Sequence, residues 1–447
     1  MTVEPTEPVA SDSESTIVRN VLLGIIAGLI GVLLIAAGFL GRIITEPEAT
    51  VVPAAPDASA PADSDGSRPA ASSEADFLIL DEILQILEED FVEPDRIDAA
   101  YLHSAAIAGI FDALDDPHST YIDPQTYSMS RDDFSGAFQG IGATVDKLAD
   151  ADFIIIVRPL PDTPAEAAGV LAGDLILEVD GASAEGWSVQ EGVIRIRGPQ
   201  GSPVELKVRH SDGTEEVITI VRDEIHVASV STIAPVNGGK LLDSEGEEAT
   251  DIAYIRIFSF TSRTPDELQA AIEEAEANGA TGILLDVRGN PGGLLVETIQ
   301  VSDMFLDEGV IVTEVGRDGN EQTASARAGQ STRLPVVILQ DEFSASGSEL
   351  LAAALQENDR AIILGTNSFG KGTVNHVREL SNGGAVYISI ARWLTPDRNL
   401  IEGLGVTPDI VVEFTIEDID AGRDVQAERG IDALRDLADG ASVATAP

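Results

Sequence analysis

The chain has 447 residues, more than one hydrophobic core usually holds, with a net charge of −50 and no cysteine. This charge repels phosphates and so opposes nucleic acid or anionic lipid as a partner, although it also fits general solubility or adaptation to salt. The absence of cysteine excludes a thiol nucleophile, a thiolate metal site and disulfides.

An uncharged apolar run occupies residues 21–41, between Arg19 and Arg42. About 20 such residues span a bilayer as a helix. A signal peptide would have a shorter apolar core and a small-residue cleavage site after it, whereas IITEPE follows here. We therefore expect an uncleaved transmembrane helix. The following residues, 42–75, are mostly Ala, Pro, Ser and Asp, which predicts a flexible linker.

Two helices are predicted next. The stretch FLILDEILQILEEDFV, which begins at Phe77, has helical apolar spacing, and a second helix is expected over residues 98–114.

Residues 137–222 have the texture of a small β module. Turns separate four predicted strands, and we expect one short helical stretch, at PAEAAG. The strands are DFIIIV (152–157), DLILEVDG (174–181), PVELKVRH (203–210) and EEVITIVR (215–222). From Ile225 onward strands alternate with helices, which predicts an α/β sheet with parallel portions. The fold class is therefore mixed α/β.

Three segments of the α/β region suggest chemistry. In the first, LLDVRGNPGG (284–293), a buried strand runs into a glycine turn before a helix. Gly292 and Gly293 would let the backbone approach a ligand and point N–H groups at negative charge. An ordinary tight turn explains this segment equally well when it is considered alone.

The second segment is DEFSASGSELLAAAL (341–355), in which a strand ends and a helix starts near Ser346. A serine at this junction has an exposed hydroxyl beside a helix N-terminus, where backbone donors would meet an oxyanion. Alternatively, Ser344, Ser346 and Ser348 are helix caps, with Glu349 completing a capping box from Ser346.

The third segment, NSFGKGTVN (367–375), places Lys371 between two glycines in a chain with few lysines. Lysine is an efficient base only where burial disfavours its charged form; a solvated turn lysine is the alternative. His118 lies in the helical region. His376 would face away from Asn375 if residues 373–377 form a strand. No G-x-S-x-G elbow is present.

Taken together and in order, these motifs resemble the C-terminal-processing (tail-specific) serine proteases. The likeness runs from about Asp76 to Glu413 and includes DALDDPHSTYIDP, FQGIGA and WLTPDRNLIEGLGVTPDIVVE. This resemblance implies a serine–lysine catalytic pair, no metal or organic cofactor, and an embedded PDZ domain.

The resemblance assigns Ser346 as the nucleophile and Lys371 as the base. It assigns the oxyanion hole to the backbone N–H groups of Gly347 and of the Gly292–Gly293 turn. The family usually has a glutamine four residues after the lysine to orient it, whereas this chain has Asn375, one methylene shorter.

In the β module, Gly140, Ile141 and Gly142 resemble the carboxylate-binding loop of PDZ domains, whose N–H groups bind a peptide C-terminus. Arg197 resembles a position that couples PDZ occupancy to the active site in relatives; a plain turn arginine is the alternative.

The apolar segment predicts a single-pass membrane protein, and the resemblance implies a bacterial cell membrane, an extracytoplasmic catalytic domain, and substrates that are proteins or peptides with free apolar C-termini. One alternative is a membrane-tethered PDZ scaffold with an inactive core, which the departure at Asn375 favours; a cytosolic esterase is another, opposed by the anchor and the missing elbow. The expected segments are a cytoplasmic stub (1–20), a transmembrane helix (21–41), a linker (42–75), a helical segment (76–136), a PDZ domain (137–224), a protease core (225–435) and a disordered tail (436–447).

Overall fold

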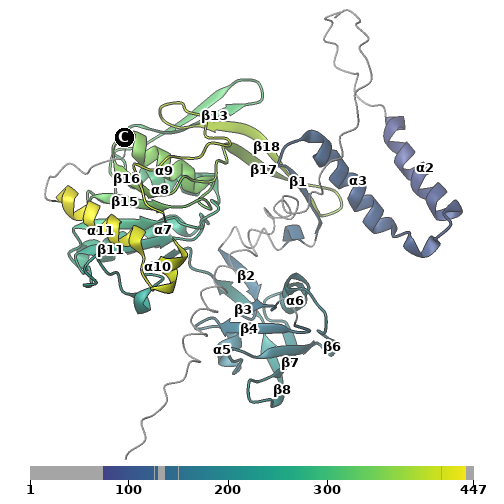
Figure 1. The fold of residues 1–447 in the computed structure, drawn as a ribbon. Helices are drawn as coiled ribbons and strands as arrows, with labels where there is room; N and C mark the ends of the chain where they lie inside the picture. The colour runs from purple at the N-terminus through teal and green to yellow at the C-terminus, as the bar shows by residue number, and fades with distance from the viewer. Residues whose placement is uncertain (1–73, 125, 129–135, 149–150, 414, 439–447) are drawn as a thin grey trace, which may run out of the picture. The chain divides into compact units, whose positions relative to one another are not determined.

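A computed structural model describes residues 74–438, apart from 125, 129–135, 149–150 and 414 (Figure 1). The predicted cytoplasmic stub and transmembrane helix, the predicted linker up to residue 73 and the predicted tail from residue 439 lie outside the described residues. Residues 74–75, assigned to the linker, are helical, and so are residues 436–438, assigned to the disordered tail. Within the described part of the chain, no helix is long and apolar enough to cross a bilayer. The described residues up to 121 form one compact unit, and those from 122 onward form a second.

The first unit consists mainly of the two predicted helices, α2 (Glu74–Asp90) and α3 (Ala99–Leu114), with a 3-10 turn, η2 (Pro94–Arg96), between them. Asp98 caps α3, because its carboxylate accepts a hydrogen bond from the amide of Tyr101 at 3.1 Å. The helix stops at Asp115, which has a left-handed backbone conformation with φ of 56°. Strand β1 (Thr120–Ile122) follows.

The β module in the second unit contains the four predicted strands and the short helix at PAEAAG. Its main sheet has the order β3-β4-β5-β7-β8, with β6 beside β5, while β2 pairs with β9. The elements are β2 (Ala137–Gly140), β3 (Ala143–Asp146), β4 (Ile154–Pro159), α5 (Pro164–Ala167), β5 (Leu175–Val179), β6 (Ala182–Ser183), α6 (Val189–Ile196), β7 (Pro203–Arg209), β8 (Glu215–Val221) and β9 (Asp223–His226).

Helix α6 corrects the expectation of a single helical stretch in this module. Its sequence, VQEGVIRI, is short and rich in β-branched residues, so its periodicity was ambiguous. Ser188 caps it by accepting from the amide of Glu191 at 3.1 Å. Gly192 then lets the helix lie close to the sheet, since a Cβ there would be 2.3 Å from Ile154 Cδ1. Tertiary packing therefore selects the helix.

The α/β region is built on a six-stranded sheet of order β10-β11-β12-β15-β16-β19. Strand β10 is antiparallel to β11, and the other neighbouring pairs are parallel. This arrangement confirms the predicted sheet with parallel portions. The strands are β10 (Val230–Ser231), β11 (Ile252–Ile257), β12 (Gly282–Asp286), β15 (Val336–Gln340), β16 (Ala361–Gly365) and β19 (Ile410–Val411).

Helices cover both faces of this sheet, so the strands in its middle are buried on both sides. One face packs against α7 (Thr264–Ala277), α8 (Leu295–Asp303) and α9 (Gly347–Glu357), with Ile255, Leu285 and Ile338 among the contacts. The other face packs against α11 (Val425–Ala438). Short elements η3 (Asn237–Gly239) and α10 (Ile416–Asp420) lie in the connections.

A second, antiparallel sheet was not anticipated from the sequence. In it β14 pairs with β13, β13 with β18, and β18 with β17. Its strands are β13 (Val310–Gly316), β14 (Glu321–Ser325), β17 (Thr373–Glu379) and β18 (Ala385–Leu394). Strand β17 begins two residues after Lys371, so the loop that contains the predicted base joins β16 of the first sheet to this second sheet.

Candidate active site

The three predicted catalytic segments follow three neighbouring strands. Residues 289–293 follow β12, Ser346 follows β15, and Lys371 follows β16. These strands are adjacent and parallel. Their carboxyl ends therefore share one edge of the sheet, the usual place for a site in an open α/β fold.

Exposure distinguishes Ser346 from its two neighbouring serines. Ser344 and Ser348 are buried, and their hydroxyls donate to backbone carbonyls, Ser344 to Val287 at 2.8 Å and Ser348 to Asn290 at 2.9 Å. Ser346 is partly exposed at the N-terminus of α9, with φ of 53°, which is rare for a non-glycine residue. The strained turn thus presents one serine hydroxyl to a substrate.

Glu349 links the turn at Ser346, called here the nucleophile turn after its predicted role, to the loop at Gly370 and Lys371, called the lysine loop. Its buried carboxylate accepts hydrogen bonds from the amides of Ser346 (2.7 Å), Gly370 (2.6 Å) and Lys371 (2.9 Å), and from the hydroxyl of Ser368 (2.6 Å). Burial raises the pKa of this carboxyl, and these four hydrogen bonds oppose that rise. The structure confirms the capping box between Ser346 and Glu349 that the sequence offered, and the same carboxylate also contacts the loop that contains Lys371.

The glycine turn after β12 lies directly against Ser346. A Cβ on Gly292, whose φ is 102°, would lie 2.7 Å from the Gly347 nitrogen and 2.9 Å from Ser346 Cβ. The Gly292 amide donates to Asn290 Oδ1 at 2.8 Å. Within the residues that the structure describes, the amides of Gly293 and Gly347 donate to no acceptor. These two N–H groups, rather than that of Gly292, remain available to an oxyanion.

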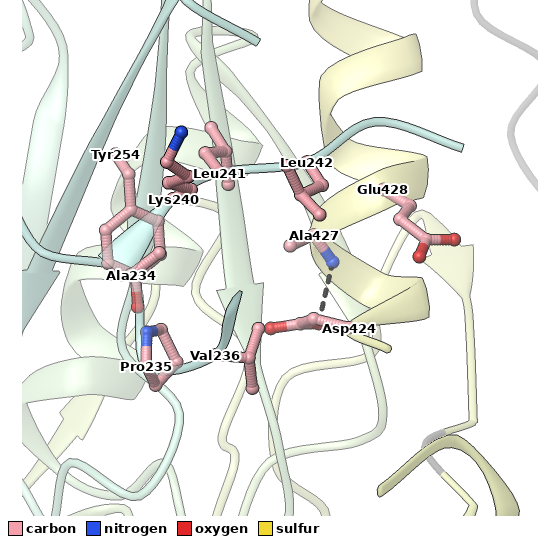
Figure 2. Close-up of a pocket in the computed structure, with 10 residues that line it drawn as sticks. All are labelled: Ala234, Pro235, Val236, Lys240, Leu241, Leu242, Tyr254, Asp424, Ala427 and Glu428. Carbon is pink, nitrogen blue, oxygen red and sulfur yellow. Dashed lines mark hydrogen bonds between the residues drawn. The ribbon is translucent and has the colours of Figure 1, made fainter. Parts of the chain in front are cut away.

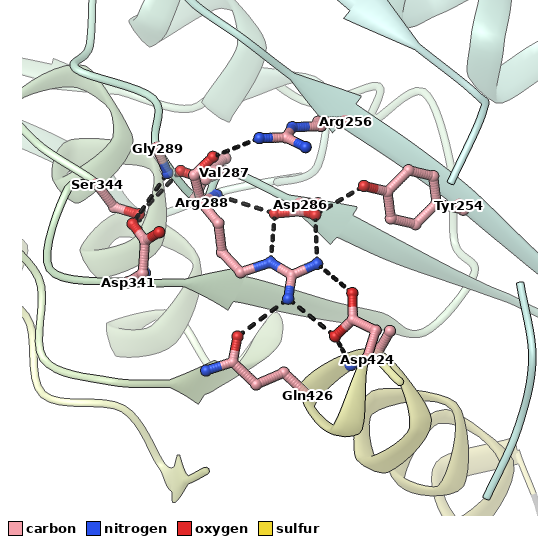
Figure 3. A network of polar contacts seen from close by, with 11 residues as sticks. Tyr254, Arg256, Asp286, Val287, Arg288, Gly289, Asp341, Ser344, Asp424 and Gln426 are labelled. Carbon is pink, nitrogen blue, oxygen red and sulfur yellow. Dashed lines mark hydrogen bonds and ion pairs between the residues drawn. The ribbon is translucent and has the colours of Figure 1, made fainter. Parts of the chain in front are cut away.

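A buried ion-pair network lies just before the glycine turn and holds the end of β12 in place (Figure 3). Asp286 accepts from Tyr254 Oη at 2.7 Å and from Arg288 Nη2 at 2.7 Å and Nε at 3.0 Å. Arg288 also donates to Asp424, at 2.8 and 2.9 Å, and to Gln426 Oε1 at 3.0 Å, so it joins β12 to the start of α11.

The charges in this network are matched. Burial alone would raise the pKa of Asp286, but Arg288 and Arg256, with hydrogen bonds from Arg288 and Tyr254, hold it at about 2. Burial also opposes the charge on Arg288, yet Asp286 and Asp424 raise its pKa above the ordinary arginine value. Both groups are therefore charged at neutral pH, and their pairing fixes the direction in which the chain leaves β12.

Asp341 connects the two turns. Its Oδ1 accepts from the amides of Gly289 (2.9 Å) and Phe343 (3.1 Å) and from the hydroxyl of Ser344 (3.1 Å), as Figure 3 shows in part. Burial, and then the charge of Asp286, raise the pKa of this carboxyl.

A pocket borders the ion-pair network but is separate from Ser346 and Lys371. It is lined by residues of the 234–242 loop, Tyr254, and residues 424–428 at the start of α11 (Figure 2). Its lining shares Tyr254 and Asp424 with the ion-pair network and includes neither Ser346 nor Lys371. The predicted chemistry therefore does not belong to this pocket.

Lys371 is held firmly by its backbone and loosely by its side chain. Its amide donates to Glu349 and its carbonyl accepts from Trp393 Nε1 at 3.2 Å. Its Nζ donates to Tyr387 Oη at 3.4 Å and lies 5.3 Å from the centroid of that ring. Among the described residues, no hydrogen bond joins Nζ to Ser346. The loop nevertheless adjoins the nucleophile turn, since the amide of Phe369 donates to the Ser344 carbonyl at 3.0 Å.

Asn375 lies on β17, as the strand expected over residues 373–377 requires. Its amide oxygen accepts from Thr373 Oγ1 at 3.2 Å and its Nδ2 donates to Ser389 Oγ at 3.2 Å. The neighbouring His376 is exposed, in agreement with the expected alternation.

The predicted carboxylate loop closes the end of β2 in the β module. Gly142 has φ of 78°, and a Cβ there would lie 2.4 Å from Thr163 Cβ. Its carbonyl accepts from Thr163 Oγ1 at 2.9 Å, and that of Ile141 accepts from the Ala165 amide at 2.8 Å. In the described part of the chain, the amides of Ile141 and Gly142 have no acceptor.

Arg197 lies beside this loop. Its guanidinium carbon is 4.4 Å from the centroid of the Phe138 ring, and a Cβ on Gly140 would be 3.6 Å from Arg197 Cγ. The structure therefore places it next to the loop, at the end of α6.

Comparison with known proteins identifies the family. Residues 251–412 match peptidase family S41, and residues 134–209 match the PDZ domain. A carboxy-terminal-processing protease of Bartonella bacilliformis is 40% identical over 72% of this chain and 71% of its own length. The chain belongs to the S41 carboxy-terminal-processing proteases. It is therefore a serine-type peptidase with a PDZ domain.

Other relatives of this protease are similar. The carboxy-terminal processing protease CtpA of Bacillus subtilis is 34% identical over 78% of this chain and 72% of its own length. A solved photosystem II D1 C-terminal processing protease is 27% identical, covering 77% of this chain and 94% of its own, with a TM-score of 0.44.

Sequence reasoning passed over several residues of this site. Tyr387 carries no motif, because its relation to Lys371 depends on how β18 pairs with β17. Asp286 and Arg288 lie at the end of the apolar strand β12, and charged residues there could have indicated a buried ion pair, because charged residues are rarely buried unless they are paired. No comparable signal pointed to Asp424, which is 138 residues beyond Asp286 in the chain.

Proposed function

We propose that this protease cuts peptide bonds by a serine–lysine mechanism, with Ser346 as nucleophile and Lys371 as general base. The observation that carries the proposal is the meeting of three segments at one sheet edge, where the exposed serine adjoins the lysine loop and two unbonded amides. Glu349, bonded to both the Ser346 and Lys371 amides, supports the same pairing.

The reaction follows acyl-transfer chemistry. Neutral Lys371 takes the Ser346 proton as the serine oxygen attacks the scissile carbonyl carbon, and the amides of Gly293 and Gly347 donate to the resulting oxyanion. The C–N bond then breaks, and the leaving amine receives the proton from Lys371. The amine of Lys371, neutral again, then takes a proton from water, which attacks the acyl-enzyme. The proton returns from Lys371 to the serine oxygen as the acyl–oxygen bond breaks, and this regenerates Ser346. For the attack, Lys371 Nζ must come within hydrogen-bonding distance of the Ser346 hydroxyl.

The PDZ domain supplies the substrate preference in this proposal. The unbonded amides of Ile141 and Gly142 are suited to a terminal carboxylate, and β3 is an edge strand to which a peptide can add. The buried Ile141 and Ile196 beside this region support an apolar C-terminal residue. Asn375 orients the lysine only indirectly, and Arg197 couples the two domains.

We propose residues 21–41 as a single-pass anchor in a bacterial cell membrane, with the catalytic domain on the extracytoplasmic side. The length and apolarity of that segment support this location. The full chain is expected to stay with membranes through high-salt and carbonate washing, and a chain starting near Ser73 to be soluble and active. A mature protein that begins just after Arg42 would show a cleaved signal instead.

A fluorophosphonate probe tests the mechanism against the alternative of a PDZ scaffold with an inactive core. Such probes label a serine only when its hydroxyl is activated. We expect labelling of wild type at Ser346, located by peptide mapping, and none in Ser346→Ala. An unlabelled wild-type protein that still binds peptides with free C-termini would support the scaffold.

A further inference from the structure

Tyr387 is the described residue that contacts the reactive atom of Lys371. The lysine Nζ donates to the tyrosine hydroxyl at 3.4 Å, and the ring centroid lies 5.3 Å from the same nitrogen. The lysine backbone is fixed through Glu349 and Trp393, so the side chain is the part that remains free to move.

Strand pairing puts Tyr387 on the face that also carries Asn375. Tyr387 pairs with Val377, and Ser389 pairs with Asn375, in the antiparallel register of β17 and β18. Residues two apart on a strand share a face, and so do directly paired residues. The Asn375 amide is bonded to Ser389 and Thr373, whereas the Tyr387 hydroxyl meets the lysine.

Both parts of the tyrosine favour a charged lysine. An aromatic face attracts an ammonium electrostatically, and a phenol oxygen accepts a hydrogen bond from it. A lysine that serves as a base must be neutral and must face Ser346. The contact therefore holds the amine where, among the described residues, it has no hydrogen bond to Ser346.

We propose that Tyr387 is a positioning residue for Lys371: its hydroxyl and ring hold the amine and so control how the amine reaches Ser346. This inference rests on the serine–lysine mechanism proposed above. It assigns to Tyr387, rather than to Asn375, the direct control of the lysine side chain.

The test compares pH–rate profiles of kcat/KM for a peptide substrate in the full chain. Tyr387→Phe removes the hydroxyl and keeps the ring, and we expect its half-maximal activity at a pH about half a unit lower than wild type. Tyr387→Leu also removes the ring, and its profile is expected about one unit lower. Tyr101→Phe, at an exposed tyrosine of the helical unit, is the matched control and should leave the profile unchanged.

Several outcomes separate this inference from simpler roles. A Tyr387→Phe or Tyr387→Leu enzyme with lower activity but an unmoved profile would show a purely structural role and overturn the proposal. Thermal melting identifies a variant that has not folded, and the pH profile of the other variant then decides. Lys371→Arg is assayed beside them: if it is inactive while the Tyr387 profiles match wild type, only this inference fails. An active Lys371→Arg would remove the serine–lysine mechanism as well.

Discussion

The nucleophile turn and the lysine side chain follow neighbouring strands but are held in different ways. Around Ser346, buried groups fix the backbone. The Glu349 carboxylate accepts a hydrogen bond from the Ser346 amide, and the hydroxyls of Ser344 and Ser348 donate to backbone carbonyls of the segment after β12. Among the described residues, the Lys371 side chain instead has one long hydrogen bond, 3.4 Å, to a tyrosine on the second sheet.

This difference indicates that the two catalytic groups are prepared to different degrees. The strained φ of Ser346 is maintained because buried contacts determine its position, so the nucleophile and the Gly347 amide are preorganised. Lys371 has a fixed backbone and a movable amine. In the proposed mechanism, the nucleophile and the oxyanion hole are therefore already in place, while the amine of the base can still change position. The predictions below test each side of this comparison.

The largest effect is expected from Ser346→Ala. Removing the attacking oxygen should lower proteolysis by more than about a thousandfold, with folding intact because the residue is partly exposed. Peptide cleavage and thermal melting are the measurements. Ser348→Ala, which loses one buried hydrogen bond to Asn290, is the matched control and should keep measurable activity. Wild-type cleavage by the Ser346 variant would end the proposed mechanism.

Lys371→Arg tests the role of the movable lysine side chain. Arginine keeps the charge but is not deprotonated in proteins, so activity should fall by about a thousandfold. The loop should stay in place, because the bonds of residue 371 to Glu349 and Trp393 involve only its backbone. Cleavage rates between pH 6 and 10 provide the measurement. Appreciable activity would rule out lysine as the base and return attention to His376.

Asp286→Asn tests how far the buried ion pair with Arg288 stabilises the fixed backbone after β12. Breaking the buried pair with Arg288 should lower the free energy of unfolding by about 3 kcal/mol at pH 7. The pKa of Asp286 is about 2 in the folded protein, below its unfolded value of about 3.9. Its contribution is therefore present above about pH 4 and is lost as pH falls towards 2.

Urea unfolding at a series of pH values between 6 and 2 measures this difference. The stability gap between wild type and Asp286→Asn should narrow as pH falls, whereas Asp318→Asn, at an exposed position between β13 and β14, should follow wild type. A gap that stays constant with pH would mean that the Asp286 charge does not contribute.

A smaller effect is expected from the substrate terminus. A peptide with a free apolar C-terminus should be cut about tenfold more efficiently than its amide, because the amide removes the charge that the loop amides of Ile141 and Gly142 would bind. Steady-state assays should place the difference in KM. Equal values for the acid and the amide would leave the PDZ domain without its proposed role.

The smallest effect is expected at Asn375. Its amide bonds to Thr373 and Ser389, so Asn375→Ala should reduce kcat/KM by less than about tenfold, and Asn375→Gln should be tolerated. The same peptide assay compares both with Lys371→Ala. A loss in Asn375→Ala as large as that in Lys371→Ala would place Asn375 in direct contact with the base during catalysis.

Local pattern was sufficient for much of this protein. The helices α2 and α3 follow from apolar periodicity, and the central strands of the α/β sheet follow from short apolar runs that the sheet buries on both faces. The segments containing Ser346, Lys371 and Gly292–Gly293 were located because each follows an apolar strand with turn residues. The order of those segments also indicated the family that the comparisons then showed.

Only the tertiary structure decided the rest, because it depends on groups distant in the chain. Helix α6 forms because Gly192 packs on Ile154, which overrides an ambiguous local pattern. Arg288 is paired by Asp424, far away in sequence, because α11 packs on the sheet beside β12. Tyr387 reaches Lys371 because of the register between β17 and β18, and a one-residue slip would turn it to the other face. The sequence thus indicated which residues are proposed to carry the chemistry, and long-range packing determined how firmly each is held.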